Sequence, residues 1–331
     1  MMSFAALMDA NENILLIRLK SIGDIVFTLP AVHVVRDNFP SAKITFLTSK
    51  ESAPLLRGFR EVNEVIPLDR AALGSGNPLR ILPEFFSLLR RLRAGKFSLV
   101  VDFQGYGETA WLSWLSGAPQ RWGSVYGPGR RWAYTRGVTR DDRRHHVERD
   151  LSLLKQCGLR PGKMVNEFVL PEHALNEARQ FFAANNLDVA KPTLFLQPFT
   201  SSPHKNWPLE NYLALAEHWR SRDVQIIFGG GPNDRKPLEP ARRNFIIAAG
   251  TSLLVSAGLM KLSTAVIGAD TGLLHLGVAM GKRVVMLMQS AAPGKPHPFG
   301  HADWALTPPP GKMVAAISLG DVIGACESLL A

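Results

Sequence analysis

Cysteine is scarce in this sequence of 331 residues, which contains only Cys157 and Cys326. So few cysteines argue against a disulfide framework or a cysteine metal site, and they favour a reducing compartment. No apolar stretch approaches the ~20 residues that a membrane-spanning helix requires. Residues 1–11 lack a basic start and a long apolar run, so we expect no signal peptide. Any membrane contact is therefore expected at the surface of the bilayer.

Acidic residues are also few, because 28 Asp and Glu oppose 38 Lys and Arg and leave a net charge of +10. This balance favours anionic partners such as phosphates, nucleic acid or acidic lipid. The sequence also contains a cluster of eight arginines between Arg121 and Arg149. A solvated basic loop and a binding patch explain this cluster equally well. No zinc-finger, basic-zipper or RNP-like motif is present, so we expect no nucleic-acid partner. The cluster comprises Arg121, Arg130, Arg131, Arg136, Arg140, Arg143, Arg144 and Arg149.

Apolar residues make up 46% of the sequence and charged residues 20%, as in ordinary globular proteins, and the length suffices for two domains. Short apolar runs typical of buried parallel strands alternate with stretches at helical spacing in both halves. This alternation predicts an α/β protein with two doubly wound units. The apolar runs are 13–19, 43–48, 64–68, 97–103, 193–197, 224–228, 265–268 and 283–288.

Proline and glycine flank a short apolar run between Pro161 and Pro171, and we place the junction of the two units there. Residues 69–78 contain Gly74, Gly76 and Pro78, which predict a mobile loop. One face of a final helix carries Val322, Cys326, Leu329 and Leu330. We therefore divide the chain into residues 1–165, residues 166–312 and a C-terminal helical segment, 313–331.

The first segment with candidate functional residues runs from Asp270 through Thr271 and Gly272 to His275. It follows an expected strand and opens a helix, with Asp270 as the expected N-cap. Unpaired N–H groups and the helix dipole make such a helix start an anion site, and Gly272 lets a phosphate come close. An ordinary capped helix with a packed His275 explains the segment equally well.

A second segment, Thr200 to Pro208, also follows an expected strand. Its hydroxyl groups and Lys205 suit a phosphate, because open α/β sheets bind ligands at the carboxyl ends of their strands. Pro208 suits the first turn of a helix. Alternatively, Lys205 is merely solvated and Trp207 staples the start of that helix.

Lys20, Ser21 and Asp24 form a third segment at the end of the first strand. A carboxylate in this place could act as a general base. Taken alone, however, Asp24 is better explained as the N-cap of the following helix.

Residues 105–110 read Gly-Tyr-Gly-Glu-Thr-Ala and fit the dinucleotide pattern G-x-G-x-x-A. No acidic residue lies roughly 20 positions further on, and the pattern follows a late strand, so a dehydrogenase is not expected. Asp-x-Asp, the metal-holding pair of many nucleotide-sugar enzymes, is absent too. We therefore expect no metal or other cofactor, and we expect cationic side chains and helix dipoles as phosphate partners.

Taken together and in this order, these segments resemble glycosyltransferase family 9, the heptosyltransferases of lipopolysaccharide core synthesis. Each fragment is short, but the ordered set is specific and covers nearly the whole chain. The resemblance implies a GT-B fold, in which two Rossmann-like domains face each other across a cleft and a C-terminal helix packs back on the first. The fragments are Ile14-Leu15-Leu16-Ile17-Arg18, Gly23-Asp24, Thr28-Leu29-Pro30-Ala31, Val101-Asp102-Phe103-Gln104-Gly105, Lys205-x-Trp207-Pro208 and Asp270-Thr271-Gly272-x-x-His275-Leu276.

The activity that the resemblance implies is an inverting, metal-independent transfer of a sugar, typically heptose from ADP-heptose. The implied acceptor is a lipopolysaccharide-core or other lipid-linked saccharide, met in the cytoplasm at the inner face of the membrane. By motif position, Asp24 resembles the catalytic base, and Lys205 resembles a group that stabilises the leaving diphosphate. The other implied donor contacts are Thr200, Ser201, either Asn233 or Asp234, Thr251, Asp270, Thr271, Gly272 and His275, and the acceptor-side residues are Lys20, Ser21, Gln104 and Glu108.

The sequence departs from the family pattern at three places. Glu108 stands where many relatives carry Lys or Arg, residues 289–292 replace a Gly-Pro-Thr-like turn, and residues 277–279 replace an alanine-rich run. These departures concern the acceptor more than the donor chemistry. Two other functions stay open, namely a nucleotide-sugar epimerase on the same scaffold and a non-catalytic basic protein that binds nucleic acid or lipid.

Overall fold

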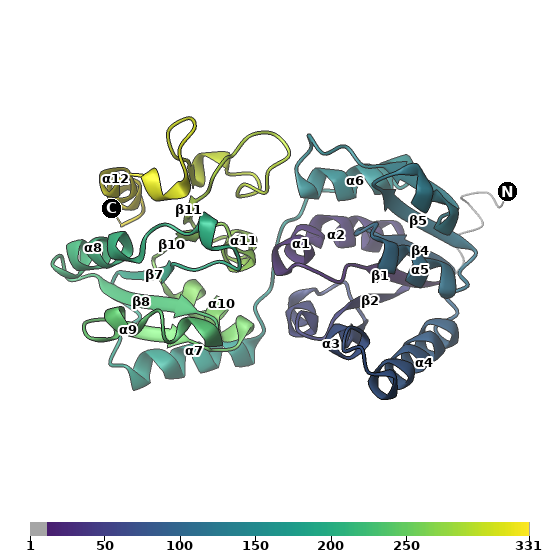
Figure 1. Cartoon of the computed structure of the whole chain (residues 1–331), viewed down its shortest axis with the longest axis horizontal. Helices are drawn as coiled ribbons and strands as arrows, with labels where there is room; N and C mark the ends of the chain where they lie inside the picture. The colour runs from purple at the N-terminus through teal and green to yellow at the C-terminus, as the bar shows by residue number, and fades with distance from the viewer. Residues whose placement is uncertain (1–11, 331) are drawn as a thin grey trace. The chain divides into compact units, whose positions relative to one another are not determined.

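The computed structural model describes residues 12–330, so the stretch 1–11, where we predicted no signal peptide, lies outside the described residues. The chain divides into two compact units, one up to Asn166 and one from Glu167 onward, within the predicted junction. Each unit is an α/β structure around one six-stranded parallel sheet (Figure 1), which confirms the predicted fold class. Within residues 12–330, no helix is long and apolar enough to cross a membrane.

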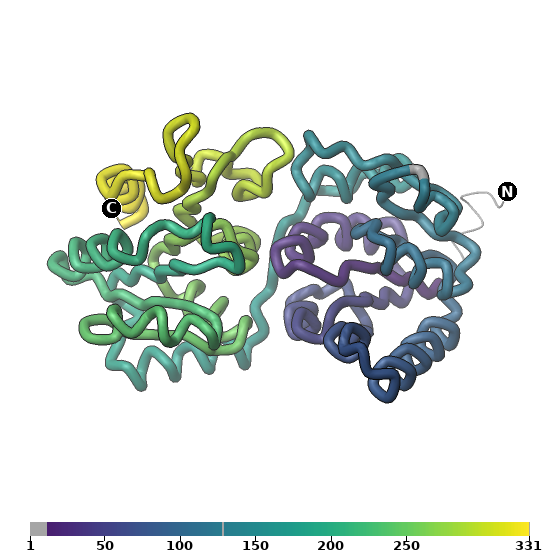
Figure 2. Tube along the Cα trace, viewed as in Figure 1, coloured from purple at the N-terminus to yellow at the C-terminus, as the bar shows by residue number. Residues whose placement is uncertain are grey.

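The first unit is coloured from purple to teal along the chain (Figures 1 and 2). Its strands are β1 (Asn13–Ile17), β2 (Lys43–Ser49), β3 (Glu64–Leu68), β4 (Leu99–Asp102), β5 (Gln120–Val125) and β6 (Arg136–Thr139). Its helices are α1 (Ile22–Phe27), α2 (Leu29–Asn38), α3 (Arg70–Leu73), α4 (Pro78–Ala94), α5 (Gly107–Leu115) and α6 (His146–Gln156), with the 3₁₀ helices η2 (Ala53–Gly58) and η3 (Pro128–Ala133).

The second unit repeats the alternation of strands and helices. Its strands are β7 (Thr193–Gln197), β8 (Gln225–Gly230), β9 (Ile246–Ala249), β10 (Ala265–Ala269), β11 (Val284–Leu287) and β12 (Ala305–Leu306). Its helices are α7 (Glu172–Ala184), α8 (Leu209–Arg220), α9 (Glu239–Arg242), α10 (Leu253–Leu262), α11 (Gly272–Ala279) and α12 (Leu319–Leu330), with the 3₁₀ helices η4 (Pro203–Lys205), η5 (Pro232–Asp234), η6 (Ala302–Trp304) and η7 (Val314–Ala316).

Both sheets have the same strand order. The first sheet runs β3-β2-β1-β4-β5-β6, and the second, read from its other edge, runs β9-β8-β7-β10-β11-β12. The central strands are almost continuously apolar, because helices bury both faces of a parallel sheet. The strand order reverses between β1 and β4 and again between β7 and β10. Such a reversal opens a ligand-binding crevice at the carboxyl ends of the strands.

All eight predicted strands are present, with small shifts at their ends, but two other expectations were wrong. Residues 69–78 include the short helix α3, because the Asp69 side chain caps it by accepting a hydrogen bond from the amide of Ala72. The C-terminal helix is not a separate segment, because Val322 and Cys326 are fully buried in the core of the second unit with α8. Its contact with the first domain stays a prediction.

Candidate functional site

Asp24 lies in α1, directly after the central strand β1. Ser21 is the N-cap of this helix, and its backbone N–H donates to Asp24 Oδ2 over 3.1 Å. The amide of Asp24 donates in turn to Ser21 Oγ over 3.4 Å, which completes a capping box. Asp24 is thus the acidic member of the capping box and not the N-cap that the segment alone suggested. The box fixes its carboxylate at the switch point of the first sheet.

A histidine and an arginine contact the other oxygen of Asp24. His146 Nδ1 lies 2.8 Å from Asp24 Oδ1, and Arg18 Nη2 lies 3.4 Å from the same atom. Burial raises the pKa of Asp24, but the His146 hydrogen bond and the Arg18 charge outweigh it and hold the pKa well below its usual range. Burial lowers the pKa of His146, against the pull of Asp24. At neutral pH, Asp24 is therefore ionised, and a neutral His146 donates from Nδ1.

Arg18 connects this carboxylate to a deeper one. Its Nη1 donates to the carbonyl of Phe103 over 2.5 Å and lies 3.3 Å from Asp150 Oδ1. Burial raises the pKa of Asp150 to about 7, although the charge of Arg18 acts in the opposite direction. Within the described part of the chain, Asp150 Oδ2 is buried and has no hydrogen-bond partner. Arg18 is therefore shared between two carboxylates, of which only Asp24 is partly exposed, at 28% of its side chain.

Gln104, a predicted acceptor-side residue, supports the loop between β1 and α1. Its Oε1 accepts hydrogen bonds from the backbone amides of Leu19 and Lys20 over 2.7 and 3.2 Å. Gln104 thereby holds the segment that carries Lys20 and Ser21. Glu108 lies outside this network and forms an exposed ion pair with Arg70 at 3.3 Å. Such exposed pairs contribute little stability, about 0–1 kcal/mol.

A row of aromatic and cationic side chains extends from Lys20 over the carboxyl ends of β4, β5 and β6. Lys20 Nζ lies 5.8 Å from the centre of the Tyr106 ring, and the Tyr106 and Tyr126 rings are 5.3 Å apart. Arg140 lies 4.2 Å and Arg130 6.0 Å from the Tyr126 ring. Both rings are exposed. We call these five residues the tyrosine row; its rings and cations suit a sugar with an acidic group.

The predicted arginine cluster is largely engaged within the first unit. The structure therefore favours local structural roles for most of these residues over one open basic patch. Among residues 12–330, only the Arg131 side chain of this cluster forms no hydrogen bond or ion pair. Backbone carbonyls accept from Arg121, Arg130 and Arg136, while nearby aspartates pair with Arg140, Arg143, Arg144 and Arg149.

Asp270 is the centre of the corresponding cluster in the second unit. It follows β10, and its two oxygens lie 3.0 Å from Lys205 Nζ and 3.1 Å from His275 Nε2. Burial raises the pKa of Asp270, but His275 and Lys205 together lower it below its usual value. The expected N-cap role was wrong, because Thr271 caps α11 while Asp270 binds these two side chains. Lys205 keeps 40% of its side chain exposed, so its ammonium group can reach a ligand.

The loop after β7 carries Lys205 and brings it beside Asp270, because β7 and β10 are neighbours. Thr200 shapes this loop, since its Oγ1 accepts from the amide of Ser202 and donates to the carbonyl of the same residue. Asn206 accepts from the Thr200 amide over 2.9 Å. Ser201 is exposed. The loop thus holds its shape through Thr200 and leaves Ser201 accessible.

Trp207 closes this loop, and its stapling role is confirmed. It immediately precedes the N-cap of α8, and its buried ring lies 5.0 Å from that of Tyr212, in the first turns of the helix. Its indole N–H donates to the carbonyl of Ile317 over 2.8 Å. Pro208 is the N-cap rather than a residue of the first turn, so α8 begins at Leu209.

The remaining predicted donor contacts lie at the carboxyl ends of β8 and β9. Asp234 Oδ2 accepts from the amide of Gly231 over 2.7 Å, whereas Asn233 is exposed. Thr251 donates to the carbonyl of Ala248 and lies 2.7 Å from the hydroxyl of Ser256. The structure therefore places them along one edge of the sheet with Lys205, but it shows no direct contact with the Asp270 cluster.

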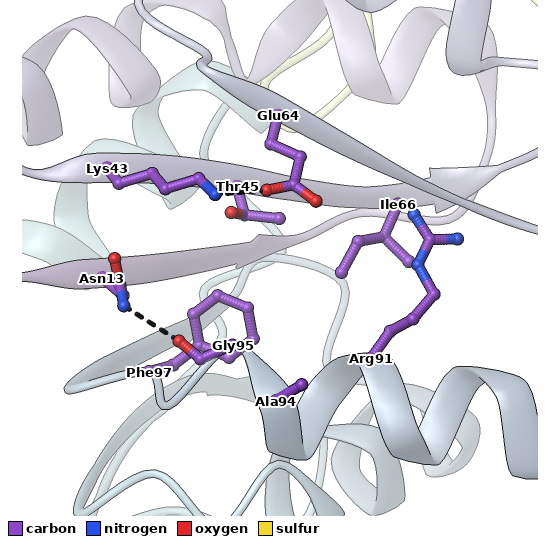
Figure 3. A pocket seen from close by; sticks show the side chains of 9 residues that line it. All are labelled: Asn13, Lys43, Thr45, Glu64, Ile66, Arg91, Ala94, Gly95 and Phe97. Carbon is purple, nitrogen blue, oxygen red and sulfur yellow. Dashed lines mark hydrogen bonds and ion pairs between the residues drawn. The ribbon is translucent and has the colours of Figure 1, made fainter.

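One well-formed cavity of about 290 Å³ lies at the opposite edge of the first sheet (Figure 3). Lys43 and Glu64 form an ion pair of 2.6 Å there, and Asn13 donates to the carbonyl of Gly95. The cavity is at the amino ends of β1, β2 and β3, away from every candidate residue. We therefore assign it no functional role. Within residues 12–330, no group of three or more His, Cys, Asp and Glu could hold a metal ion.

Sequence reasoning missed His146, Asp150 and Tyr126, and it gave Arg18 no role. One signal was present, since Arg18 ends an otherwise apolar strand and a buried guanidinium requires acidic partners. No pattern connected it to His146 or Asp150, which come from α6 and are more than 120 residues distant.

Comparison with known proteins identifies the class. A glycosyl transferase family 9 structure from Veillonella parvula superposes with a TM-score of 0.85 at 22% identity, covering 96% of this chain and 97% of that one. Escherichia coli heptosyltransferase WaaC with ADP-2-deoxy-2-fluoro heptose gives 0.78 at 21% identity, over 96% and 99% of the chains. Lipopolysaccharide core heptosyltransferase OpsX of Haemophilus influenzae is 22% identical over 308 residues, which are 89% of this chain and 84% of that protein.

Two Rossmann-like units, each with a polar cluster at its switch point, give this chain the GT-B fold of these solved structures. The family model of glycosyltransferase family 9 (heptosyltransferase) matches residues 85–310, about two thirds of the sequence. The chain belongs to this family.

Proposed function

We propose that this enzyme transfers heptose from ADP-heptose to a lipopolysaccharide-core or other lipid-linked saccharide, with inversion and without a metal ion. The observation that carries the proposal is the ionised Asp24 at the first switch point, held by Arg18 and His146. Two relatives support the sugar, since WaaC was solved with an ADP-heptose analogue and OpsX is a lipopolysaccharide core heptosyltransferase. A lipid-linked acceptor places the reaction at the inner face of the cytoplasmic membrane.

Asp24 acts as the base. The acceptor hydroxyl oxygen attacks the anomeric carbon from the face opposite the diphosphate, so a new C–O bond forms as the old one breaks. ADP leaves with the bonding electron pair, and the hydroxyl proton passes to Asp24. Because its low pKa makes Asp24 a weak base, we expect the proton to move late, after C–O bond formation has begun.

The second unit binds the donor. Lys205 and the N–H groups at the start of α11, near Thr271 and Gly272, face the growing charge on the diphosphate, and each lowers the activation barrier by a few kcal/mol. Asp270 orients Lys205, and His275 orients Asp270. The other proposed donor contacts along the same edge are Thr200, Ser201, Thr251 and one of Asn233 and Asp234.

On the acceptor side, Lys20 and Ser21 flank the base, and Gln104 acts through the loop that it holds. The tyrosine row continues from Lys20 and would receive a neighbouring acidic sugar. Glu108 lies on the same unit, where Arg70 pairs with its carboxylate.

The test is Asp24→Ala, with Asp24→Asn as the variant of matched shape. We expect both to abolish transfer while calorimetry shows unchanged ADP binding. Near-normal turnover in either variant would refute the mechanism. Incubation with donor alone separates the epimerase alternative, which predicts isomerised donor in the absence of acceptor. Thermal shift with ADP, GDP and UDP tests the nucleotide, since a ligand that binds only the folded state raises its stability.

A further inference from the structure

Three tryptophans form an exposed cluster on the first unit. Trp111 and Trp114 come from α5, and Trp132 comes from η3. Their ring centres lie 4.6 to 6.1 Å apart, and 53%, 46% and 47% of their surfaces are exposed, in chain order. Large apolar side chains that gather at a surface in this way mark an interaction site. The proposed transfer reaction uses none of these rings.

Helix α4 extends the apolar surface. Leu88 and Leu92 bury one of its faces, whereas Leu79, Leu82 and Phe86 are 84%, 51% and 61% exposed. The spacing i, i+3, i+7 aligns these three on a second face of the helix. We call them, together with the three tryptophans, the Trp–α4 face.

The two parts of this face come from neighbouring elements that line one cavity. Helix α4 packs against α3 and α5 in the first unit (Figure 1). The ring of Phe86 lies 5.8 Å from that of Phe85. Phe85 and Trp111 line the same cavity, of about 650 Å³, between α3, α4 and α5. Trp111 and Phe85 thus meet the same cavity from α5 and α4, and the Arg70–Glu108 ion pair also belongs to its lining.

Positive charge surrounds the Trp–α4 face. Arg90 and Arg93 follow Phe86 by four and seven residues and so continue its stripe, and exposed Arg131 adjoins Trp132. Residues 70–135 contain nine Arg and Lys but only three acidic residues. Of those three, Asp102 is buried and Glu108 is paired with Arg70. Exposed Arg90, Arg93 and Arg131 therefore place positive charge beside the apolar residues.

We propose that the Trp–α4 face docks on an anionic lipid bilayer. Tryptophan combines an apolar body with a polar N–H group and is enriched at the boundary between water and lipid. Arginines beside such rings attract anionic headgroups, whereas a protein partner or a second copy of this chain would require no such charge. The inference rests on the proposed function only in that a lipid-linked acceptor brings the enzyme to a membrane.

The test is co-sedimentation with vesicles of phosphatidylcholine alone and of equal parts phosphatidylcholine and phosphatidylglycerol. We expect wild-type protein to bind the anionic vesicles and not the neutral ones. Trp114→Ser/Trp132→Ser and, separately, Arg90→Glu/Arg93→Glu should each weaken this binding roughly tenfold or more. The control, Arg222→Glu/Arg243→Glu, makes the same charge change at exposed positions of the second unit and should bind as wild type.

Other outcomes distinguish this proposal from its rivals. Equal vesicle binding by all variants, or no binding by wild type, would overturn it. A wild-type dimer that the tryptophan variant loses would also overturn it and assign the face to a second copy of the chain. Transfer to a soluble, deacylated acceptor should persist in both face variants. If the wild-type protein also fails to transfer sugar to this soluble acceptor, the result counts against the proposed function and not against the docking face.

Discussion

His146 and Asp24 form a direct contact of 2.8 Å between Nδ1 and Oδ1, although 122 residues separate them in the sequence. The contact joins the start of α6 to the start of α1 within one unit. The hydrogen bond from His146 and the charge of Arg18 hold the pKa of Asp24 below its usual range, and they thereby keep its carboxylate ionised. His146 is therefore a positioning residue that also sets the pH range in which Asp24 can accept a proton.

Replacement of His146 by Ala should reduce kcat roughly tenfold to a hundredfold, because the carboxylate loses its orientation. Loss of the donor also raises the pKa of Asp24, so the acid limb of the kcat profile should move to higher pH. His146→Gln, which retains an N–H donor, should recover part of both effects. A His146→Ala enzyme with wild-type kcat and an unshifted profile would exclude this role.

Lys205→Ala should weaken ADP binding about tenfold to a hundredfold, the range for one lost hydrogen bond to a charged group. The remaining His275 contact keeps Asp270 partnered, so the loss should reflect the missing ammonium rather than unfolding. Titration calorimetry measures the effect, and Lys191→Ala is the control, an exposed lysine that pairs with Asp223. Equal ADP affinity in Lys205→Ala and the control would remove Lys205 from the donor site.

Asp150 should make the folded protein lose stability as pH rises. Its folded pKa is raised to about 7, whereas an unfolded aspartate titrates near ~3.9, so between these values only the folded state keeps the proton. The unfolding free energy therefore falls with rising pH across this window. In Asp150→Asn this fall of the unfolding free energy with pH should disappear. The melting temperature of the variant should therefore decline less than that of wild type between the two pKa values. Parallel curves for the two proteins would show that Asp150 stays ionised beside Arg18.

The sequence was sufficient to predict features that depend on local pattern. Buried parallel strands are apolar along their length, so β1, β7 and β10 were recognised, and with them the positions of Asp24, Lys205 and Asp270 at strand ends. The partners of these residues could not be predicted in the same way. Whether Asp270 caps a helix or binds a lysine depends on β7 lying beside β10. The three tryptophans likewise come together only because η3 packs on α5.

Gly105 gives a structural test of the glycine pattern that resembled a dinucleotide motif. Its φ is +67°, and a Cβ added there would lie 1.9 Å from the carbonyl oxygen of Ser124, so the backbone must move. Gly107, the other glycine of the pattern, opens α5 and has open space around its Cα. Gly105→Ala should therefore lower the unfolding free energy by about 1–3 kcal/mol in urea titrations, whereas Gly107→Ala should be nearly neutral.

Gly105→Ala should also affect the candidate site, because Gln104 precedes it and holds the Lys20 amide. Displacement of that loop would raise the KM for the acceptor while ADP affinity in the second unit stays unchanged. The role of Gly105 does not depend on its close approach to β5 if Gly107→Ala lowers the unfolding free energy more than Gly105→Ala does. The same conclusion follows if Gly105→Ala weakens ADP binding.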